Sequence, residues 1–255
     1  MPETFERKTV AILVVGMAGS GKTSFIQRFN SSSHAKKMRT YIVNIDPAAT
    51  KIPYVPNIDI RDTINFKKVM KDYGLGPNGA ILTAANLFAT RFDQVISLCE
   101  RRRSEIDFIV IDTPGQIEIF TWSASGTIVT EAVASRFKTF LFYVLDTSRS
   151  NNNPQVFVSN MLQAISVLYK SQVKLILLLN KVDITNSKQI RTWLSDFEKF
   201  QAAFDIVSNS ASELGRSLGF IIEEFYARLS LIDISCRTGE GFEDVFKLLR
   251  NEAGL

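Results

Sequence analysis

The sequence predicts an α/β fold in which a mostly parallel central sheet is flanked by helices. Two observations support this prediction. Short runs rich in β-branched and aromatic residues alternate with helical patterns along the chain, and these runs are almost entirely apolar, as strands covered on both faces require. The 255 residues are 45% apolar and 22% charged, so the chain is long enough and apolar enough to bury a large core.

The predicted core contains six strands that alternate with helices. The strands cover Val10–Val15, Tyr41–Ile45, Phe108–Ile111, Thr139–Leu145, Lys174–Leu179 and Leu231–Ile234. Helices are expected to begin near Lys22, Gly79, Asn153, Ser187 and Gly241. Because a helix follows nearly every strand, the crossovers favour parallel strands whose carboxyl ends meet at one edge of the sheet.

The chain contains no internal repeat and no linker rich in proline or glycine, which predicts a single domain over residues 1–255. Two segments exceed a minimal core, at about 52–103 and about 192–229. The second belongs to a stretch with apolar residues at gaps of three and four, namely Ile190, Trp193, Leu194, Phe197, Phe200, Phe204, Val207, Ala211, Leu214, Leu218, Ile221, Phe225 and Leu229. Such a stripe packs on its own domain or forms a groove for a partner segment, and both interpretations stay open.

Composition excludes several classes of function. His34 is the single histidine, which excludes a histidine triad, and Cys99 and Cys236 are too few for a zinc ribbon or a disulfide framework. No apolar run approaches the roughly 20 residues needed to span a bilayer, so no membrane partner is expected. The net charge of +4 is dispersed, and Arg101–Arg103 is interpreted as a solvated helix end, so no direct contact with nucleic acid is expected.

The loop after the first predicted strand, from Gly16 to Thr23, fits the pattern G-x-x-x-x-G-K-[ST]. This is a phosphate-binding loop, or P-loop, because its glycines let the backbone approach phosphate and the following helix points its amides there. Lys22 would reach the β and γ oxygens, and the Thr23 hydroxyl would coordinate Mg²⁺. The fold is therefore predicted to be that of a P-loop NTPase, with helical insertions. The predicted nucleotide contacts in this loop are Gly19, Ser20, Gly21, Lys22, Thr23 and Ser24.

The third predicted strand is followed by Asp112-Thr113-Pro114-Gly115-Gln116. An aspartate at the carboxyl end of a buried strand beside the P-loop strand is a second predicted Mg²⁺ ligand, usually through water. The Gly115 N–H would contact the γ-phosphate and sense its loss. Gln116 would orient the attacking water, and Glu118 would polarise or position it.

A third motif reads the base. The strand Lys174–Leu179 is followed by the N-K-x-D sequence Asn180, Lys181, Val182 and Asp183. The Asp183 carboxylate can accept hydrogen bonds from the guanine ring N–H and the exocyclic amine, which adenine lacks. Asn180 and the Lys181 stem would support the base and the loop, and the backbone N–H of Cys236 would meet guanine O6. The three motifs predict GTP or GDP with Mg²⁺.

With these residues in place, the sequence resembles the GPN-loop GTPases, most closely the first of their three eukaryotic paralogues, the XPA-binding-protein-1-like group. The resemblance covers nearly the whole chain. Besides the motifs above, it rests on Asn44–Ala48, Asp59–Ile64 and Leu75–Ala80, which contains the Gly-Pro-Asn tripeptide. The Pro-Asn-Gly sequence within Gly76–Gly79 by itself predicts a β-turn.

The resemblance implies a dimer, formed with a second copy or with a paralogue, in which the Gly-Pro-Asn loop of one subunit reaches the phosphates held by the other. Asn78 would then act in trans on the leaving phosphate. Asp46 would lie near Mg²⁺ or the attacking water, beside Gln116 and Glu118. Together with Lys22, these are the predicted catalytic residues.

The resemblance also implies a biological setting. The family association is with assembly and nuclear import of RNA polymerase II, so polymerase subunits or assembly factors are the expected partners. The expected location is the cytoplasm, with shuttling to the nucleus. Two other functions stay open: a GTP-gated assembly scaffold with negligible hydrolysis and, less favoured, a P-loop nucleotide or polynucleotide kinase. A kinase would have no use for the sequence Asn180–Asp183.

Overall fold

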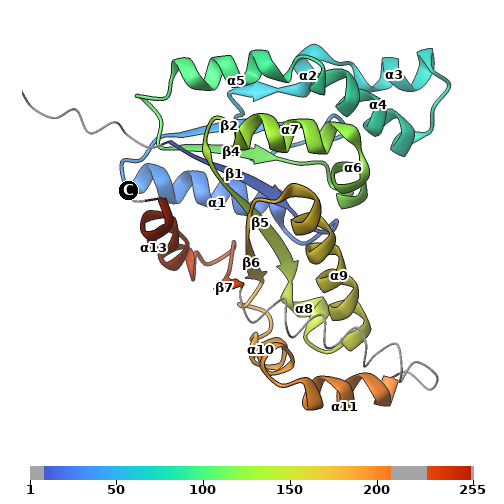
Figure 1. Cartoon of the computed structure of the whole chain (residues 1–255), viewed down its shortest axis with the longest axis vertical. Coiled ribbons are helices and arrows are strands. Elements are labelled where there is room, and N and C mark those ends of the chain that lie inside the picture. Colours follow the sequence, from blue (N-terminus) through green and yellow to red (C-terminus); the bar gives the residue numbers. More distant parts are fainter. Residues whose placement is uncertain (1–8, 208–228, 254–255) are drawn as a thin grey trace, which may run out of the picture.

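The computed structural model describes residues 9–207 and 229–253. Its seven strands form one sheet in the order β3-β2-β4-β1-β5-β6-β7, and each adjacent pair is parallel. Helices lie on both faces of this sheet (Figure 1). The predicted α/β fold with a parallel sheet is confirmed.

The strands agree with the predicted ones to within one residue at each end. They are β1 (Val10–Val15), β2 (Thr40–Asn44), β3 (Ile58–Asp59), β4 (Phe108–Asp112), β5 (Lys138–Asp146), β6 (Lys174–Asn180) and β7 (Ser230–Ile234). The edge strand β3 is the exception, because two residues are too short to produce a periodic pattern in the sequence.

The five predicted helix starts lie within two residues of observed ones, and the sequence analysis did not resolve the short helices between them. The helices are α1 (Lys22–Ala35), α2 (Ile60–Thr63), α3 (Phe66–Asp72), α4 (Pro77–Ala89), α5 (Phe92–Arg101), α6 (Ile117–Trp122), α7 (Ala124–Ala134), α8 (Thr147–Ser150), α9 (Pro154–Ser171), α10 (Lys188–Ser195), α11 (Phe197–Val207) and α13 (Phe242–Ala253). Among these residues, no helix is both long and apolar enough to cross a membrane.

The two faces of the sheet bury separate clusters. Alternate residues of β1 point to opposite sides, so that Ile12 joins one cluster and Leu13 the other. Helices α1 and α13 cover the Ile12 side, where the rings of Phe29 and Phe246 stack with centroids 4.9 Å apart. Helices α4 to α7 and α9 to α11 cover the Leu13 side. The central strand is thereby held on both faces, which fixes the position of the loop that follows it.

The Phe-rich segment forms two helices rather than one continuous stripe. The Asp196 carboxylate accepts a hydrogen bond of 3.1 Å from the Lys199 N–H and so caps the start of α11. Trp193 and Phe200 lie with ring centroids 5.3 and 6.0 Å from that of Phe157 in α9. This half of the stripe therefore packs on its own domain. The other half, from Ala211 to Phe225, lies outside the described residues.

The Gly-Pro-Asn sequence is not the β-turn that its composition predicts. Gly76 is the N-cap of α4, and Pro77 is the first helical residue. Proline is favoured at this position because its fixed φ suits a helix and it has no N–H group to leave unpaired. Asn78 and Gly79 thus lie in the first turn of α4, so the backbone of the motif is held by a helix rather than by a turn.

Candidate functional site

Four strand ends bring the predicted site residues together. Strand β1 lies between β4 and β5, and β6 lies beside β5. Val14 of β1 is in register with Asp112 of β4, and Asp146 of β5 is in register with Asn180 of β6. Because all these strands are parallel, the segments that follow them meet at the carboxyl edge of the sheet, where α/β proteins place their ligands.

The P-loop needs its glycines for steric reasons. Gly16 has φ 146°, and a Cβ there would stand 2.4 Å from the carbonyl oxygen of Val144. Gly21 has φ 103°, and a Cβ there would stand 2.3 Å from the Asn180 side-chain nitrogen. Both backbone conformations are costly for any residue with a side chain. The loop is therefore wedged between β5 and the N-K-x-D segment.

Lys22 is buried within this loop. Its ammonium group donates to the carbonyl oxygens of Gly16 at 2.7 Å and Gly115 at 3.4 Å. Burial lowers the pKa of Lys22, although the carboxylates of Asp112, Asp46 and Glu118 oppose the shift. The lysine thus links the P-loop to the loop after β4. Thr23 and Ser24 follow it in the first turn of α1, with Thr23 half-buried and Ser24 exposed.

Asp112 lies at the floor of the site. Its Oδ2 accepts hydrogen bonds from Tyr54 and, at 3.4 Å, from the Thr23 hydroxyl. Its Oδ1 is buried and has no hydrogen-bond partner among the described residues. Burial raises the pKa of Asp112 to about 6.

These oxygens fit Mg²⁺. An uncompensated carboxylate oxygen beside a hydroxyl is the hard donor set that this ion prefers. The described residues contain no cluster of three or more His, Cys, Asp or Glu side chains that could hold a metal. Mg²⁺ commonly uses one or two protein oxygens, with phosphate and water completing its shell. Thr23 and Asp112 are the residues that would hold it.

Asp46 lies against the loop after β4. Its carboxylate accepts hydrogen bonds from the N–H groups of Ala48, at 2.9 Å, and Gly115, at 3.2 Å. Burial raises the pKa of Asp46, and these two N–H groups oppose the shift. The Gly115 N–H is the group predicted to contact a γ-phosphate, and in this structure it donates to Asp46 instead.

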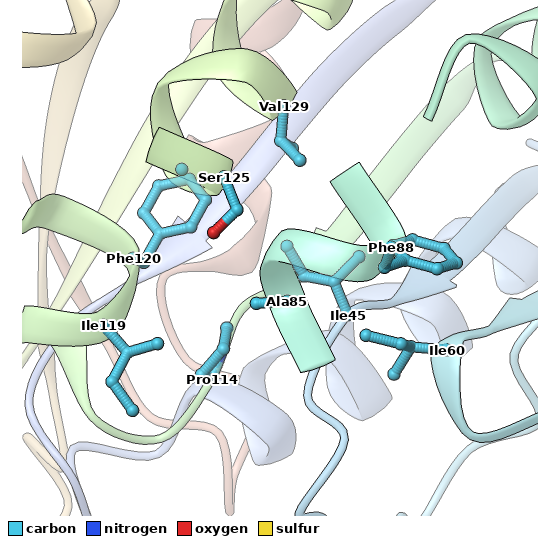
Figure 2. Close-up of a pocket in the computed structure, with 10 residues that line it drawn as sticks. Ile45, Ile60, Ala85, Phe88, Pro114, Ile119, Phe120, Ser125 and Val129 are labelled. Atoms are coloured by element: carbon cyan, nitrogen blue, oxygen red, sulfur yellow. The ribbon is translucent and has the colours of Figure 1, made fainter. Parts of the chain in front are cut away.

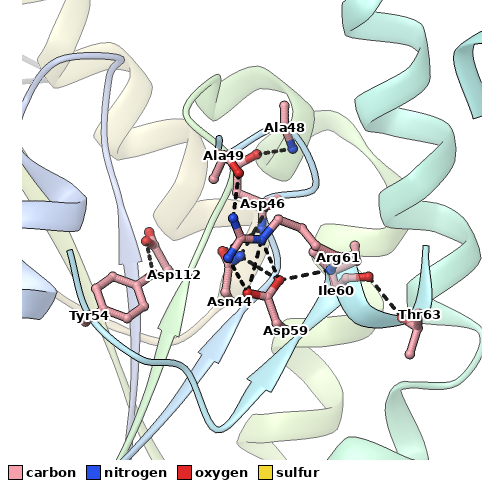
Figure 3. Close-up of polar contacts among 10 residues, drawn as sticks. All are labelled: Asn44, Asp46, Ala48, Ala49, Tyr54, Asp59, Ile60, Arg61, Thr63 and Asp112. Carbon is pink, nitrogen blue, oxygen red and sulfur yellow. Dashed lines mark hydrogen bonds and ion pairs between the residues drawn. The ribbon is translucent and has the colours of Figure 1, made fainter. Parts of the chain in front are cut away.

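A series of hydrogen bonds through Arg61, Asp59 and Asn44 leads to the backbone of Asp46 (Figure 3). The Arg61 guanidinium forks onto the Asp59 carboxylate, with one contact of 2.6 Å. Asp59 accepts in turn from the Asn44 side-chain NH₂ group at 3.0 Å, and the Asn44 side-chain oxygen accepts the Asp46 N–H at 3.1 Å. Burial by itself would raise the pKa of Asp59, but the hydrogen bonds from Arg61 and Asn44 lower it below its ordinary value.

The structure brings Asn78 and Gln116 of the same chain together. The Gln116 side-chain amide donates to the Asn78 carbonyl oxygen at 2.9 Å. Glu118 is the second residue of α6, and it is exposed. Of the predicted catalytic residues, the structure thus joins Gln116 directly to Asn78 of the same chain.

A small apolar cavity lies between α4 and the loop after β4 (Figure 2). Its volume is about 10 Å³, close to the lower limit for a single water. The walls come from the segments before and after β3, from α4 and from the segment around α6, and include Ile45, Ile60, Ala85, Phe88, Pro114 and Ile119. The loop after β4 and helix α4 thus line the same cavity.

The base-side residues are joined to the P-loop by a dense set of bonds. Asn180 is buried; its amide donates to the carbonyl of Ser20 at 2.8 Å, and its carbonyl accepts the Cys236 N–H at 3.2 Å. Lys181 donates to the Gly19 carbonyl at 3.0 Å. The exposed Asp183 accepts from the Ser235 hydroxyl at 2.7 Å. The Cys236 N–H, predicted to meet the base, is thus paired with Asn180 here.

Two residues in this arrangement escaped the sequence analysis. Asp146 accepts from the Lys181 ammonium at 2.6 Å and so fixes the lysine of the N-K-x-D sequence. Its signal was present, since an acidic residue ends a buried strand there just as Asp112 does. Tyr54, which donates to Asp112, gave no signal, because nothing in the local pattern distinguishes it from a core tyrosine. Val182, between Lys181 and Asp183, is half-buried, and its N–H donates to the Ile234 carbonyl oxygen at 3.3 Å.

Comparison with known proteins agrees with this geometry. A family model described as "Conserved hypothetical ATP binding protein" matches residues 14–254. "GPN-loop GTPase 1" of Dictyostelium discoideum is 50% identical over 241 residues, covering 94% of this chain and 61% of that protein. "GPN-loop GTPase 1" of Schizosaccharomyces pombe is 47% identical over 254 residues, covering 96% of this chain and 69% of that protein. The chain spans less than two thirds of the Dictyostelium relative.

A solved structure shares the fold. The crystal structure of a GTPase in apo form from Pyrococcus abyssi is similar with a TM-score of 0.78 and 26% identity, covering 95% of this chain and 97% of that one. The resemblance first seen in the motifs is therefore confirmed over nearly the whole length. This chain belongs to the GPN-loop GTPase family.

Proposed function

We propose that this chain binds GTP with Mg²⁺ and hydrolyses it to GDP and phosphate. One observation supports this most directly: the Asn180 side chain bonds the P-loop at Ser20 across 2.8 Å. That contact fixes the base-reading Asp183 at a set distance from the phosphate-binding Lys22. A site that holds these two motifs at a fixed separation can recognise the guanine base and the phosphates of one nucleotide at the same time. The family description that mentions ATP does not explain a carboxylate at position 183.

The residues divide the work in the following way. Lys22 leaves its carbonyl partners for the β- and γ-phosphates, and the backbone amides of the loop bind the remaining oxygens. Thr23 and Asp112 would hold Mg²⁺, which when bound would neutralise negative charge on the phosphates. Asn180, Lys181 and Asp183 hold the base.

The loop after β4 supplies the groups that act in hydrolysis. When a γ-phosphate accepts the hydrogen bond from the Gly115 N–H, the Asp46 carboxylate loses that donor. Asp46 would then lie near the attacking water or Mg²⁺. Gln116 orients a water whose oxygen attacks the γ-phosphorus. A phosphorus–oxygen bond forms to the water, the bond to the oxygen bridging the β- and γ-phosphates breaks, and GDP leaves. The proton of the water passes to solvent or to phosphate.

The functional unit is proposed to be a dimer, of two copies or of this chain with a paralogue, in which Asn78 acts on the other subunit's phosphates. In the single chain the Asn78 side-chain oxygen accepts a hydrogen bond from Gln116, whereas action in trans would use the side-chain NH₂ group of Asn78 as the donor to phosphate. The role in assembly and nuclear import of RNA polymerase II is part of this proposal and rests on family membership. Light scattering with GDP and with a non-hydrolysable GTP analogue tests the dimer; a monomer in both states, alone and with a paralogue, refutes it.

Turnover of purified protein tests the chemistry. We expect magnesium-dependent release of phosphate from GTP by the unmodified chain and none by Lys22→Ala. Labelled GTP resolved by thin-layer chromatography separates hydrolysis from a kinase, which would move the label to an acceptor. Tight GTP binding with no release of phosphate, with or without a partner subunit, would favour the assembly scaffold and refute the hydrolytic function.

A further inference from the structure

Arg149 stands at the rim of the P-loop and has no place in the chemistry described so far. It belongs to the short helix α8, which begins directly after β5. The Asp146 carboxylate caps this helix by accepting from the N–H groups of Ser148, at 3.0 Å, and Arg149, at 3.3 Å. The backbone of Arg149 is therefore fixed relative to the sheet edge.

The guanidinium group of Arg149 lies against Gly19. A Cβ placed on Gly19 would meet the two terminal nitrogens of Arg149 at 3.7 and 3.8 Å. Gly19 is an exposed residue of the phosphate-binding loop, and Lys22 is the only Lys or Arg within Gly16–Thr23. Two positive charges from outside the loop therefore meet it at Gly19: the Lys181 ammonium, which donates to the Gly19 carbonyl, and the Arg149 guanidinium, which comes from the helix after β5.

The Arg149 head group is weakly committed where it stands. Its Nε lies 3.6 Å from Asp146 Oδ2, the same oxygen that Lys181 contacts at 2.6 Å, and its side chain is 68% exposed. Because the arginine end of this ion pair is exposed to solvent and the contact is long, the pair contributes little, and its loss opposes a move towards a nucleotide very little. Asp146 keeps Lys181 and its cap bonds when Arg149 leaves.

We propose that Arg149 contacts the phosphate chain at the P-loop and offsets the charge on the oxygen that bridges the β- and γ-phosphates as its bond to the γ-phosphorus breaks. This rests on the proposed GTP hydrolysis. Arginine suits the task because its planar fork binds two phosphate oxygens together and stays charged at all physiological pH values. An arginine that serves its own subunit's nucleotide in this way is a known solution in other GTPases.

The test uses the whole chain with Mg²⁺. Single-turnover hydrolysis of GTP and the affinities for GDP and a non-hydrolysable GTP analogue are compared for the unmodified protein, Arg149→Ala and Arg149→Lys. Arg101→Ala is the matched control, because Arg101 is an exposed arginine at the end of α5. Circular dichroism and melting temperature report whether each variant folds.

We expect Arg149→Ala to lower the hydrolysis rate constant at least tenfold, with affinities for GDP and the analogue changed less than the rate. Arg149→Lys should recover part of the rate, and Arg101→Ala should behave as the unmodified chain. Folded Arg149→Ala with an unchanged rate overturns the inference. Equal losses in the rate, in both affinities and in melting temperature also overturn it, because they indicate a structural role. An unmodified chain that neither binds nor hydrolyses GTP refutes the proposed function instead.

Discussion

The two ends of the nucleotide site are built in different ways. At the base end, Asn180 and Lys181 make hydrogen bonds of 2.6 to 3.0 Å to the P-loop and to Asp146, and of these three bonds the one from Lys181 to Gly19 is exposed. At the other end, the residues expected to act on the γ-phosphate are joined by longer or exposed bonds, such as Gly115 to Asp46 at 3.2 Å and Gln116 to Asn78.

This difference matches what each end has to do. A base-reading pocket gains selectivity from groups that are already in position, because binding then costs little ordering. A γ-phosphate sensor must hold two arrangements of similar free energy, since a ligand shifts an equilibrium only by its differential affinity for them. Under the proposed function, the base end would be the preset half of the site and the γ-phosphate end the half that exchanges partners.

The largest expected effect comes from removing Asn180. Asn180→Ala leaves the Ser20 carbonyl and the Cys236 N–H without their side-chain partner, and each buried unpaired group costs about 1–3 kcal/mol. We expect the free energy of unfolding to fall by about 3 kcal/mol. Urea unfolding measures it, and nucleotide binding should weaken in parallel. A loss below about 0.5 kcal/mol, the level of an ordinary surface substitution, would show that the base end is not preset.

The next effect concerns base selection. Asp183→Asn should weaken GTP binding on the order of 100-fold, because hydrogen bonds from the base to a charged acceptor are lost. The same variant should gain affinity for xanthosine triphosphate, whose ring carries an oxygen where guanine has its amine. Asparagine keeps an oxygen for the Ser235 hydroxyl, so the fold should be unaffected. Fluorescent nucleotide titration decides it, and equal GTP affinity in both proteins removes the guanine assignment.

A pH-dependent effect is expected behind Asp46. The pKa of Asp59 lies below its ordinary value of 3.8, so its ion pair stabilises the fold fully above that pH. The contribution is lost as pH falls through the lowered pKa. Asp59→Asn should therefore reduce the free energy of unfolding by about 1.5 kcal/mol at pH 7, with the difference shrinking below pH 4. Denaturant unfolding at several pH values measures this, and a pH-independent difference contradicts the assignment to Asp59.

The smallest effects on stability, with a clear effect on rate, belong to the exchanging end. Gln116→Leu should slow GTP hydrolysis about tenfold, because the attacking water loses its orienting group. Its melting temperature should change little, since the bond to Asn78 is exposed. Asn78→Ala removes the acceptor of the same hydrogen bond. It tests whether Asn78 acts within its own chain, by holding Gln116, or in trans on the other subunit's phosphates. A slower rate only in the dimer supports action in trans, whereas unchanged rates for both variants contradict the catalytic assignment.

Local pattern was sufficient for the strands and for the nucleotide motifs. Apolar runs flanked by polar turns mark buried strands directly, and the spacing of Gly16, Gly21 and Lys22 reflects a backbone conformation set within eight residues. The N-K-x-D sequence was identifiable for the same reason. Gly76–Gly79 shows where local pattern misleads: Pro-Asn-Gly suits a turn, but the apolar residues that follow extend it into α4.

The sequence by itself determined that this chain has a parallel α/β fold with a P-loop and a base-reading loop, because those features depend on neighbours in the chain. The tertiary structure decided which side chains meet. Tyr54 reaches Asp112 across 58 positions, Lys181 reaches Asp146 across 35, and Asn180 reaches Ser20 across 160. Such pairs depend on strand order and register, which bring distant strand ends to one edge of the sheet and which no local pattern of residues encodes.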